Sequence, residues 1–377
     1  MSDVKIPETA NKGLEGVVAF TSEISAIVDV TLSYCGYTIE DLAKNSNFEE
    51  VAFLLWNLRL PKEGEWKDWQ KEIRANYELP AELVETMKRF PKTASPMEVL
   101  RTSVSMLSLW DSDSSNDSPE ALRRKSVRLL AKLPALATTW HRVRNGWDPV
   151  KPDPNKTIAA NFFYTLNGKD ADPEVVKMFD TALVLHADHE MNASTFSARV
   201  TTATLSDVHS AITTAIGTLK GPLHGGANEE AMYMLQEIAT PENAEAWIRD
   251  ALANKKKIMG FGHREYKKGD SRAIYLTQVA KEIGRRMNNT KWGDIADILE
   301  RIMLEEKNLY PNVDFPAAYA YFLLGIPIDL YTPIFVIART TGWTAHAIEQ
   351  LDNNRLIRPK CIYEGPHNVP FIPIEER

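Results

Sequence analysis

The sequence predicts an all-α protein with minor β pieces near its termini. Apolar residues recur at helical spacing in several stretches that begin with helix-capping residues. Strand-like alternation is confined to two short stretches, residues 14–20 and residues 369–374. The length of 377 residues exceeds the size at which one hydrophobic core usually stops growing, so we expect two domains rather than one.

Two helices are indicated in the first third of the chain. Asn47 is followed by glutamates in the first turn and by apolar residues within 51–58, until Pro61 ends the pattern. Residues 95–98 combine an N-cap serine, a proline at the first helical position and a glutamate suited to a capping box. Apolar residues on one face follow over 100–107, so both stretches predict amphipathic helices with defined starts.

Two further helices are indicated in the second half. Residues 208–219 repeat apolar positions until Gly221 and the proline after it end the helix. A long apolar helix starts at Thr332 and runs to about Leu351. The Gly221 turn and the stretch near Gly325 are the better domain boundaries, because a hinge needs positions that absorb backbone rotation.

The composition is that of an ordinary globular protein. Apolar residues make up 44% and charged residues 25%, and no apolar run approaches the roughly 20 residues that cross a bilayer. The first twenty residues lack an apolar signal core, so we expect a cytoplasmic location and no membrane association. The formal charge of -7 argues against nucleic-acid binding. Cys35 and Cys361 show no metal-ligand spacing and are expected to be free thiols.

Chemistry-bearing residues concentrate between His186 and Asp314. Three motifs lie there, at residues 186–195, 221–229 and 259–267, and they contain four of the eight histidines. They place glycines and imidazoles where a core needs apolar volume. Titratable groups beside glycines are what general acid and base chemistry requires, so we predict an active site in this region.

His224 lies in a glycine-rich turn before a helix that starts near Asn228. The positive end of that helix disfavours a protonated imidazole. A neutral histidine can donate a hydrogen bond to a carbonyl oxygen that becomes an enolate. The alternative is a capping or packing histidine at a helix start, because glycine-rich turns are common.

His263 follows a glycine and precedes a basic cluster at positions 264, 267, 268 and 272. In an acidic protein such a cluster favours an anionic ligand, which arginine can bind bidentately. A solvated basic turn is the alternative. The glycine spacing resembles part of a dinucleotide-binding fingerprint but lacks the flanking strand, so we discount a dinucleotide site.

Asp314 and Arg339 are charged residues among apolar neighbours. Partial desolvation would raise the pKa of Asp314 and improve it as a base, and an N-cap aspartate is the alternative. Arg339 requires a compensating anion or acid, which is often a structural salt bridge. With the histidines, these residues outline a site that removes a proton next to a carbonyl and stabilises the enolate beside a carboxylate substrate.

These motifs resemble those of the citrate synthase family. The resemblance runs along nearly the whole chain, from residues 13–17 and 48–51 through the three histidine motifs to residues 354–359. It implies a homodimer that condenses acetyl-CoA with oxaloacetate and water to give citrate and CoA. No metal and no cofactor other than the acyl-CoA substrate is implied.

The resemblance also implies a domain organisation. Residues 1–220 and 321–377 would form a large helical domain with the dimer interface and the oxaloacetate ligands. Residues 221–320 would form a small helical domain that binds CoA and closes over the active site.

Site residues follow from the same resemblance. His224 would hydrogen-bond the thioester carbonyl of acetyl-CoA while Asp314 takes a methyl proton, and His263 would polarise and protonate the oxaloacetate ketone. The implied oxaloacetate ligands are His189, Arg272, Arg339 and Arg358, the last donated by the neighbouring subunit. The implied CoA contacts are Ile258, Met259, Gly260, Phe261, Gly262, Lys267 and Asn312.

The sequence departs from the family pattern at two positions and leaves alternatives open. Glu265 and Ser271 replace a commoner valine and proline, and the extra negative charge near a CoA phosphate would weaken CoA binding. The nearest alternative is 2-methylcitrate synthase, which uses propionyl-CoA and shares the motifs. A metal-dependent hydrolase is a remote alternative, since His186, Asp188 and His189 resemble a metal-binding set. A helical scaffold without catalysis is the last.

Overall fold

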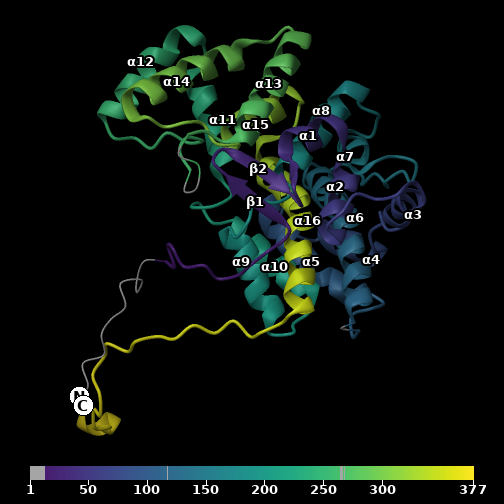
Figure 1. Cartoon of the computed structure of the whole chain (residues 1–377), viewed down its shortest axis with the longest axis vertical. Coiled ribbons are helices and arrows are strands. Elements are labelled where there is room, and N and C mark those ends of the chain that lie inside the picture. The colour runs from purple at the N-terminus through teal and green to yellow at the C-terminus, as the bar shows by residue number, and fades with distance from the viewer. Residues whose placement is uncertain (1–12, 117, 264–265, 267) are drawn as a thin grey trace.

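The computed structural model describes residues 13–116, 118–263, 266 and 268–377 (Figure 1). α-Helices dominate these residues, so the predicted all-α class is confirmed. The helices are α1 (Ile39–Asn45), α2 (Phe48–Asn57), α3 (Glu63–Arg74), α4 (Ala81–Lys88), α5 (Pro96–Leu107), α6 (Pro119–Arg144), α7 (Ile158–Asn167), α8 (Pro173–His186), α9 (Ala193–Ala203), α10 (Val208–Leu219), α11 (Ala227–Ile238), α12 (Pro241–Ala253), α13 (Ser271–Arg286), α14 (Lys291–Lys307), α15 (Asp314–Leu323) and α16 (Tyr331–Asp352). Short 3-10 helices are η1 (Ser108–Trp110), η2 (Ile328–Leu330) and η3 (Ile374–Glu376).

Each of the four helices predicted above is present. Asn47 caps α2 and Ser95 caps α5. In each case the side chain accepts a hydrogen bond from the backbone N–H three residues later in the chain. α10 ends at Leu219, as the glycine turn begins. α16 ends at Asp352, one residue beyond the predicted end.

The small β content forms one hairpin-based sheet near the N-terminus. Strands β1 (Ser25–Val28), β2 (Thr31–Tyr34) and β3 (Tyr37–Thr38) are antiparallel and lie side by side in that order. Leu32 and Tyr34 of β2 are buried, so one face of the sheet is covered by the core.

The sequence predicted the strands at the wrong positions. Residues 14–20 and 369–374 form no strand, and Val18 and Phe371 within them are 87% and 83% exposed. An alternating segment becomes a stable strand only where another segment pairs with its backbone and a core covers one face. Neither condition holds for these two segments.

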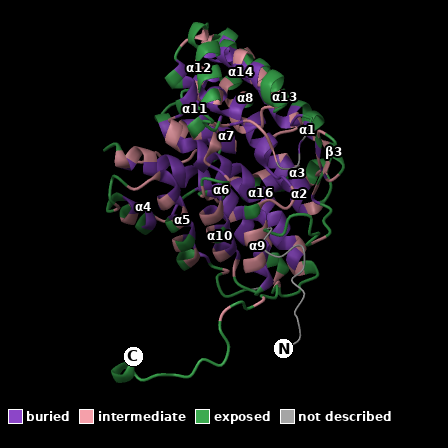
Figure 2. Cartoon of the chain, turned by 90° about the vertical axis from the view of Figure 1, so that its left-hand side faces the viewer, coloured by how far each residue is buried: buried purple, intermediate pink, exposed green. Residues whose placement is uncertain are grey.

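Helix α16 lies at the centre of the molecule. Every residue from 331 to 348 is buried, and the helix packs against α2, α6, α8, α9 and α10. Figure 2 shows this buried interior beneath an exposed outer layer. Because a helix that is buried on all sides has no solvent face, the polar side chains of α16 are held inside the protein.

Helices α11 to α15 form a second group, at the top of Figure 1. Within it, α13 and α11 both pack on α15, and α12 packs on α14. The group contacts the remaining helices through α13 against α1 and α8, and through α11 against α16. These helices span residues 227–323, so the predicted boundary after residue 320 falls inside α15. The division into two domains and their closure stay predictions.

The residues after α16 form an extended and mostly exposed tail that leaves the body of the molecule (Figure 1). Both cysteines are free thiols, as predicted. Within the described ranges, no helix is both long enough and apolar enough to cross a bilayer.

Candidate active site

His224 lies in the turn that connects α10 to α11. The turn is closed by backbone hydrogen bonds from His224 N–H to the Gly221 carbonyl at 2.9 Å and from Gly225 N–H to the Leu219 carbonyl at 3.0 Å. A Cβ at Gly225 would lie 2.4 Å from that Leu219 oxygen, so only glycine fits. Backbone geometry therefore sets the position of the imidazole.

The His224 ring faces the first turn of α9. Its Nε2 lies 3.3 Å from the backbone N and 2.8 Å from the Oγ of Ser194. Because a backbone N–H can only donate, Nε2 accepts and the ring proton is on Nδ1. Burial, and then the charge of Arg339, lowers the pKa of His224 to about 4. The ring is neutral as predicted, although burial rather than the α11 terminus is the main cause, and it also helps to cap α9.

His189, His263 and Tyr266 form a cluster of rings. The centroids of the two imidazoles are 5.0 Å apart, and the Tyr266 ring lies 5.4 Å from His189 and 4.8 Å from His263. Burial, followed by the charges of Arg272 and Arg339, holds the pKa of His189 well below its usual range. The structure thus brings the two predicted histidines together.

Arg272 has a carboxylate partner that the sequence did not predict. Asp270 caps α13 and accepts hydrogen bonds from Arg272 Nε at 3.0 Å and Nη2 at 2.7 Å. Asp270 Oδ2 also accepts the backbone N–H of Val313 at 3.3 Å, which connects this pair to the residue before Asp314. Since both members of the pair are buried, the charge of Arg272 is compensated within the protein.

The Arg339 guanidinium has a nitrogen that donates no hydrogen bond to any described residue. Its side chain is 1% exposed, its Nε donates to the His186 carbonyl at 2.8 Å, and its guanidinium lies 4.7 Å from the centroid of Phe335. Among the described residues, none accepts a hydrogen bond from its Nη2. Burial lowers the pKa of Arg339 to about 10, with Asp188 as the main opposing charge. Such a group favours an anionic ligand.

Asp314 is the first residue of α15. Val313 is the N-cap, and the Asp314 side chain caps no backbone N–H, so the alternative prediction does not hold. Asn312 Oδ1 accepts the backbone N–H of Asp314 at 3.0 Å, whereas Asp314 Oδ1 has no partner among the described residues. Burial raises the pKa of Asp314 to about 7, against the opposing charges of Arg272 and Arg339. The predicted rise in pKa is therefore present and suits a general base at neutral pH.

The predicted CoA loop, residues 258–262, pairs with the segment before α15. Gly262 N–H donates to the Tyr310 carbonyl at 2.8 Å, and Asn312 N–H donates to the Gly260 carbonyl at 2.9 Å. Asn312 Nδ2 adds a hydrogen bond to the Gly262 carbonyl at 2.9 Å, so its side chain supports the loop from within the protein. A Cβ at Gly260 would lie 2.7 Å from the Phe315 Cβ, and its φ of +81° also favours glycine.

The remaining loop residues are partly covered. Ile258 is buried, and the Phe261 ring lies 4.6 Å from the Phe315 ring. Met259 packs against the core. Lys267 lies outside the described residues, as does Glu265. The CoA contacts of this loop stay predictions.

Arg358 is not brought to the site in its own chain. It is exposed and lies in the extended tail beyond α16 (Figure 1). This position is compatible with a role in a neighbouring subunit, which stays a prediction.

The three residues of the hydrolase alternative contact different groups. His186 Nδ1 lies 2.8 Å from a carbonyl of its own helix, and burial lowers its pKa to about 3. Asp188 accepts hydrogen bonds from Ser25 Oγ and His346 Nε2. Over the described ranges, no group of three or more His, Cys, Asp or Glu side chains is arranged to hold a metal ion.

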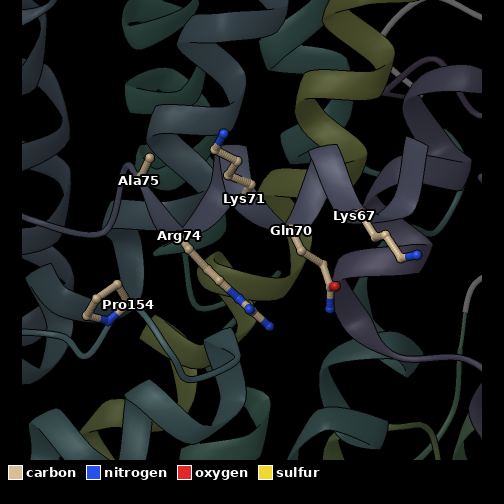
Figure 3. Close-up of a pocket in the computed structure, with 6 residues that line it drawn as sticks. All are labelled: Lys67, Gln70, Lys71, Arg74, Ala75 and Pro154. Carbon is tan, nitrogen blue, oxygen red and sulfur yellow. The ribbon is translucent and has the colours of Figure 1, made fainter. Parts of the chain in front are cut away.

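A surface cavity lies on α3, apart from these residues. Its volume is about 460 Å³, and its lining includes Lys67, Lys71 and Arg74 (Figure 3). None of the predicted site residues lines it, so it belongs to a different part of the surface.

Four residues that support the site were not predicted: Ser194, Tyr266, Asp270 and Trp343. Trp343 Nε1 donates to Ser194 Oγ at 3.1 Å, from α16 to α9. Asp270 is the N-cap of α13, and an aspartate just before a helix is a capping signal that can be read from the sequence. The others act through contacts between segments far apart in the chain, for which the sequence offers no local signal.

Comparisons with known proteins agree with this geometry. A family profile described as citrate synthase, C-terminal domain, matches residues 13–360. The chain is 52% identical over 370 residues to citrate synthase 2 of Bacillus subtilis, covering 98% of this chain and 100% of that protein. It is 44% identical over 373 residues to 2-methylcitrate synthase 2 of Corynebacterium glutamicum, covering 97% of each.

Solved structures give the same assignment. The citrate synthase of Thermoplasma acidophilum, in a ternary complex with carboxymethyl coenzyme A and oxaloacetate, superposes with a TM-score of 0.91 at 32% identity. The superposition covers 97% of this chain and 99% of that one. The chain therefore belongs to the citrate synthase family of acyltransferases.

Proposed function

We propose that this protein condenses acetyl-CoA with oxaloacetate and water to give citrate and CoA. The observation that carries the proposal is the position of Arg339, whose charge acts on His189, His224 and Asp314 alike. Its Nη2 has no acceptor among the described residues. An anionic substrate bound there would lie beside a histidine pair, a neutral histidine and a carboxyl group of raised pKa.

Oxaloacetate suits this arrangement because it carries two carboxylates. Arg339 has an Nη2 from which no described residue accepts a hydrogen bond, whereas Arg272 is already paired with Asp270. The local positive charge is therefore smaller than a count of arginines indicates. An additional cation from a second subunit, which we assign to Arg358, would balance the second carboxylate.

Proton removal from acetyl-CoA requires two groups at once, because a thioester methyl is a very weak carbon acid. Asp314, whose raised pKa of about 7 leaves part of it ionised near neutral pH, would take the methyl proton. The Nδ1–H of neutral His224 would donate to the thioester oxygen and stabilise the developing enolate. Their supports, Asn312 and Ser194, hold both groups in place before the substrate binds.

Condensation would follow at the ring cluster. The enolate carbon attacks the ketone carbon of oxaloacetate, and His263 supplies a proton to the ketone oxygen as it becomes a hydroxyl group. His189, adjacent to His263, would hold the substrate in position. Water then hydrolyses the citryl-CoA thioester to release citrate and CoA.

Domain closure is part of the proposal. His224 and Asp314 lie at the two ends of the segment that contains α11 to α15, and Arg339 lies in α16. Movement of this segment toward α16 would exclude water and complete the site. Gly325, with a φ of +74°, and the turn at Gly221 are the proposed hinges.

Thiol release from acetyl-CoA, with and without oxaloacetate and in the presence of EDTA, tests the proposal. We expect release that depends on oxaloacetate and is unaffected by EDTA. Loss of activity with EDTA would instead support the metal-dependent hydrolase. No release from a folded protein, with either acyl-CoA, would refute the proposal.

Propionyl-CoA is the substrate of the second candidate function, 2-methylcitrate synthesis. The identity of 44% to a 2-methylcitrate synthase supports this candidate. The ratio of kcat/KM for acetyl-CoA and propionyl-CoA decides between the two. The homodimer and the cytoplasmic location also stay predictions, which sedimentation and cell fractionation test.

A further inference from the structure

The hairpin of β1 and β2 lies below the group of helices α11 to α15 in Figure 1, and its first strand holds the segment after α8. Ser25 Oγ donates to Asp188 Oδ2 and accepts the backbone N–H of Glu190 at 3.0 Å. Ile27 N–H donates to Glu190 Oε1 at 2.6 Å. His189 lies between these two acidic residues in the chain, so β1 fixes the backbone on both sides of it.

Ser271 attaches the same hairpin to α13. Its backbone N–H donates to the Val30 carbonyl at 3.1 Å, and its Oγ accepts the backbone N–H of Leu32 at 3.2 Å. Ser271 is the first residue of α13, between the N-cap Asp270 and Arg272. The first N–H groups of a helix have no acceptor within the helix, so the bond to the hairpin takes nothing from α13.

The two attachments leave the hairpin on opposite sides. Ile27 and Leu32 face each other in the register of β1 and β2. Each donates its N–H to a group outside the hairpin, Ile27 to Glu190 and Leu32 to Ser271. In such a non-hydrogen-bonded pair of antiparallel strands, the two N–H groups point away from each other. The hairpin therefore bridges the segment that contains His189 and the start of α13.

Serine at position 271, where proline is commoner in the family, makes the second attachment possible. Proline has neither a backbone N–H nor a hydroxyl, so it could form neither hydrogen bond. The helix itself does not require serine, because proline suits the first helical position. Asp270, with φ of -107° and ψ of 115°, also has a backbone close to that of residues before proline. The hairpin, rather than α13, accounts for the serine.

We propose that Ser271 is a positioning residue that connects α13 to the hairpin and thereby fixes Arg272 relative to His189. The inference rests on the proposed function, which gives these two residues the same ligand, oxaloacetate. Both lie beside the Tyr266 ring, whose centroid is 5.4 Å from that of His189 and 5.8 Å from the Arg272 guanidinium. A ligand that needs both side chains binds more weakly when only a fraction of the molecules holds them in the right arrangement.

Two substitutions remove the attachment in steps. Ser271→Ala removes the hydroxyl and keeps the backbone N–H, whereas Ser271→Pro removes both. The dissociation constant of oxaloacetate, measured by calorimetry without acyl-CoA, should rise about 3-fold in the first variant and about 10-fold in the second. The KM for acetyl-CoA at saturating oxaloacetate should change by less than about 2-fold, because bound oxaloacetate then holds the two ligands in place.

Ser33→Ala is the matched control. Ser33 lies in the same hairpin, and its hydroxyl donates to the Ala26 carbonyl within the sheet at 3.3 Å. This variant loses a hydroxyl from the hairpin without touching the attachment to α13, so it should bind oxaloacetate normally. Weakening in Ser33→Ala equal to that in Ser271→Ala would overturn the inference.

A His189→Asn background separates positioning from a general loss of structure. Without the imidazole, no arrangement of His189 and Arg272 is left to fix, so Ser271→Pro should change the dissociation constant there by less than about 2-fold. An equal loss in both backgrounds overturns the inference, as does unchanged binding in Ser271→Pro. If the proline variant does not fold, unchanged binding in Ser271→Ala overturns it instead.

The proposed function is tested separately, by the wild-type protein. Oxaloacetate-dependent thiol release by that protein supports the function even where the Ser271 variants overturn the inference. Absence of that release from the wild-type protein counts against the function itself.

Discussion

Replacement of Asp314 by asparagine separates the catalytic role of this carboxyl group from its effect on stability. The substitution keeps the size of the side chain and removes a charge that burial disfavours. We expect turnover with acetyl-CoA to fall by at least about 100-fold, the usual contribution of a general base. We also expect the variant to be more stable than the wild-type protein at alkaline pH.

The size of the gain in stability follows from the pKa. An unperturbed aspartate titrates near 3.8, whereas burial raises the pKa of Asp314 in the folded protein to about 7. The folded state binds the proton more tightly than the unfolded state, so the wild-type protein loses stability as the pH rises through this interval. The full interval corresponds to about 4 kcal/mol, at about 1.36 kcal/mol for each pH unit. This value is an upper limit, because Asp314 keeps some contact with solvent.

Thermal unfolding of both proteins at about pH 8 and about pH 4 measures the effect. The variant should unfold at a higher temperature at the alkaline pH, and the difference should nearly vanish at the acidic pH. Asp68→Asn, an exposed position on α3, is the matched control and should change neither unfolding nor turnover. A difference that grows toward acidic pH would refute the electrostatic reasoning, and near-normal turnover would refute the assignment of the base.

Three further predictions use the same protein. Arg339→Met should raise the KM for oxaloacetate by at least about 100-fold through loss of a charge-assisted contact. An unchanged KM in steady-state kinetics would contradict the role of Arg339. Gly342→Ala should lower the unfolding temperature, because the added Cβ would lie 2.2 Å from a buried aspartate oxygen. The control Gly64→Ala, whose Cβ would have no atom within 4 Å, should leave the unfolding temperature unchanged. Equal unfolding temperatures for the two variants would contradict the packing argument. An equal mixture of Arg358→Ala chains and Asp314→Asn chains should recover about a quarter of the wild-type activity, since about half of the dimers are mixed and one of the two sites in each mixed dimer is complete. No recovery in any such mixture would mean that Arg358 is not shared between subunits.

The helices were predictable because their signals are local. The caps at Asn47 and Ser95 satisfy backbone N–H groups within one turn, so a few neighbouring residues are sufficient to define each start. The strands were not predictable, since the alternation of residues 14–20 is as regular as that of the hairpin. The hairpin of residues 25–34, unlike residues 14–20, has a partner strand and a covered face.

The site shows the same division between local and distant information. His224, His263 and Asp314 stand out in the sequence because glycines and apolar neighbours surround them, which ordinary packing does not require. The pairing of Arg272 with Asp270 and the uncompensated Nη2 of Arg339 are visible only when α13 and α16 are placed in space. From the sequence alone the two arginines look equivalent.

The sequence by itself determined the helical class, the capped starts of the helices at Asn47 and Ser95, the motifs that carry the chemistry and the family. These depend on residue types and spacing within a few turns of chain. Only the tertiary structure decided which histidine nitrogen carries a proton, which arginine is left to bind an anion and why the pKa of Asp314 is high. Each of these depends on burial and on groups brought together from distant segments, such as Ser194 beside His224, and such contacts arise only when the chain packs.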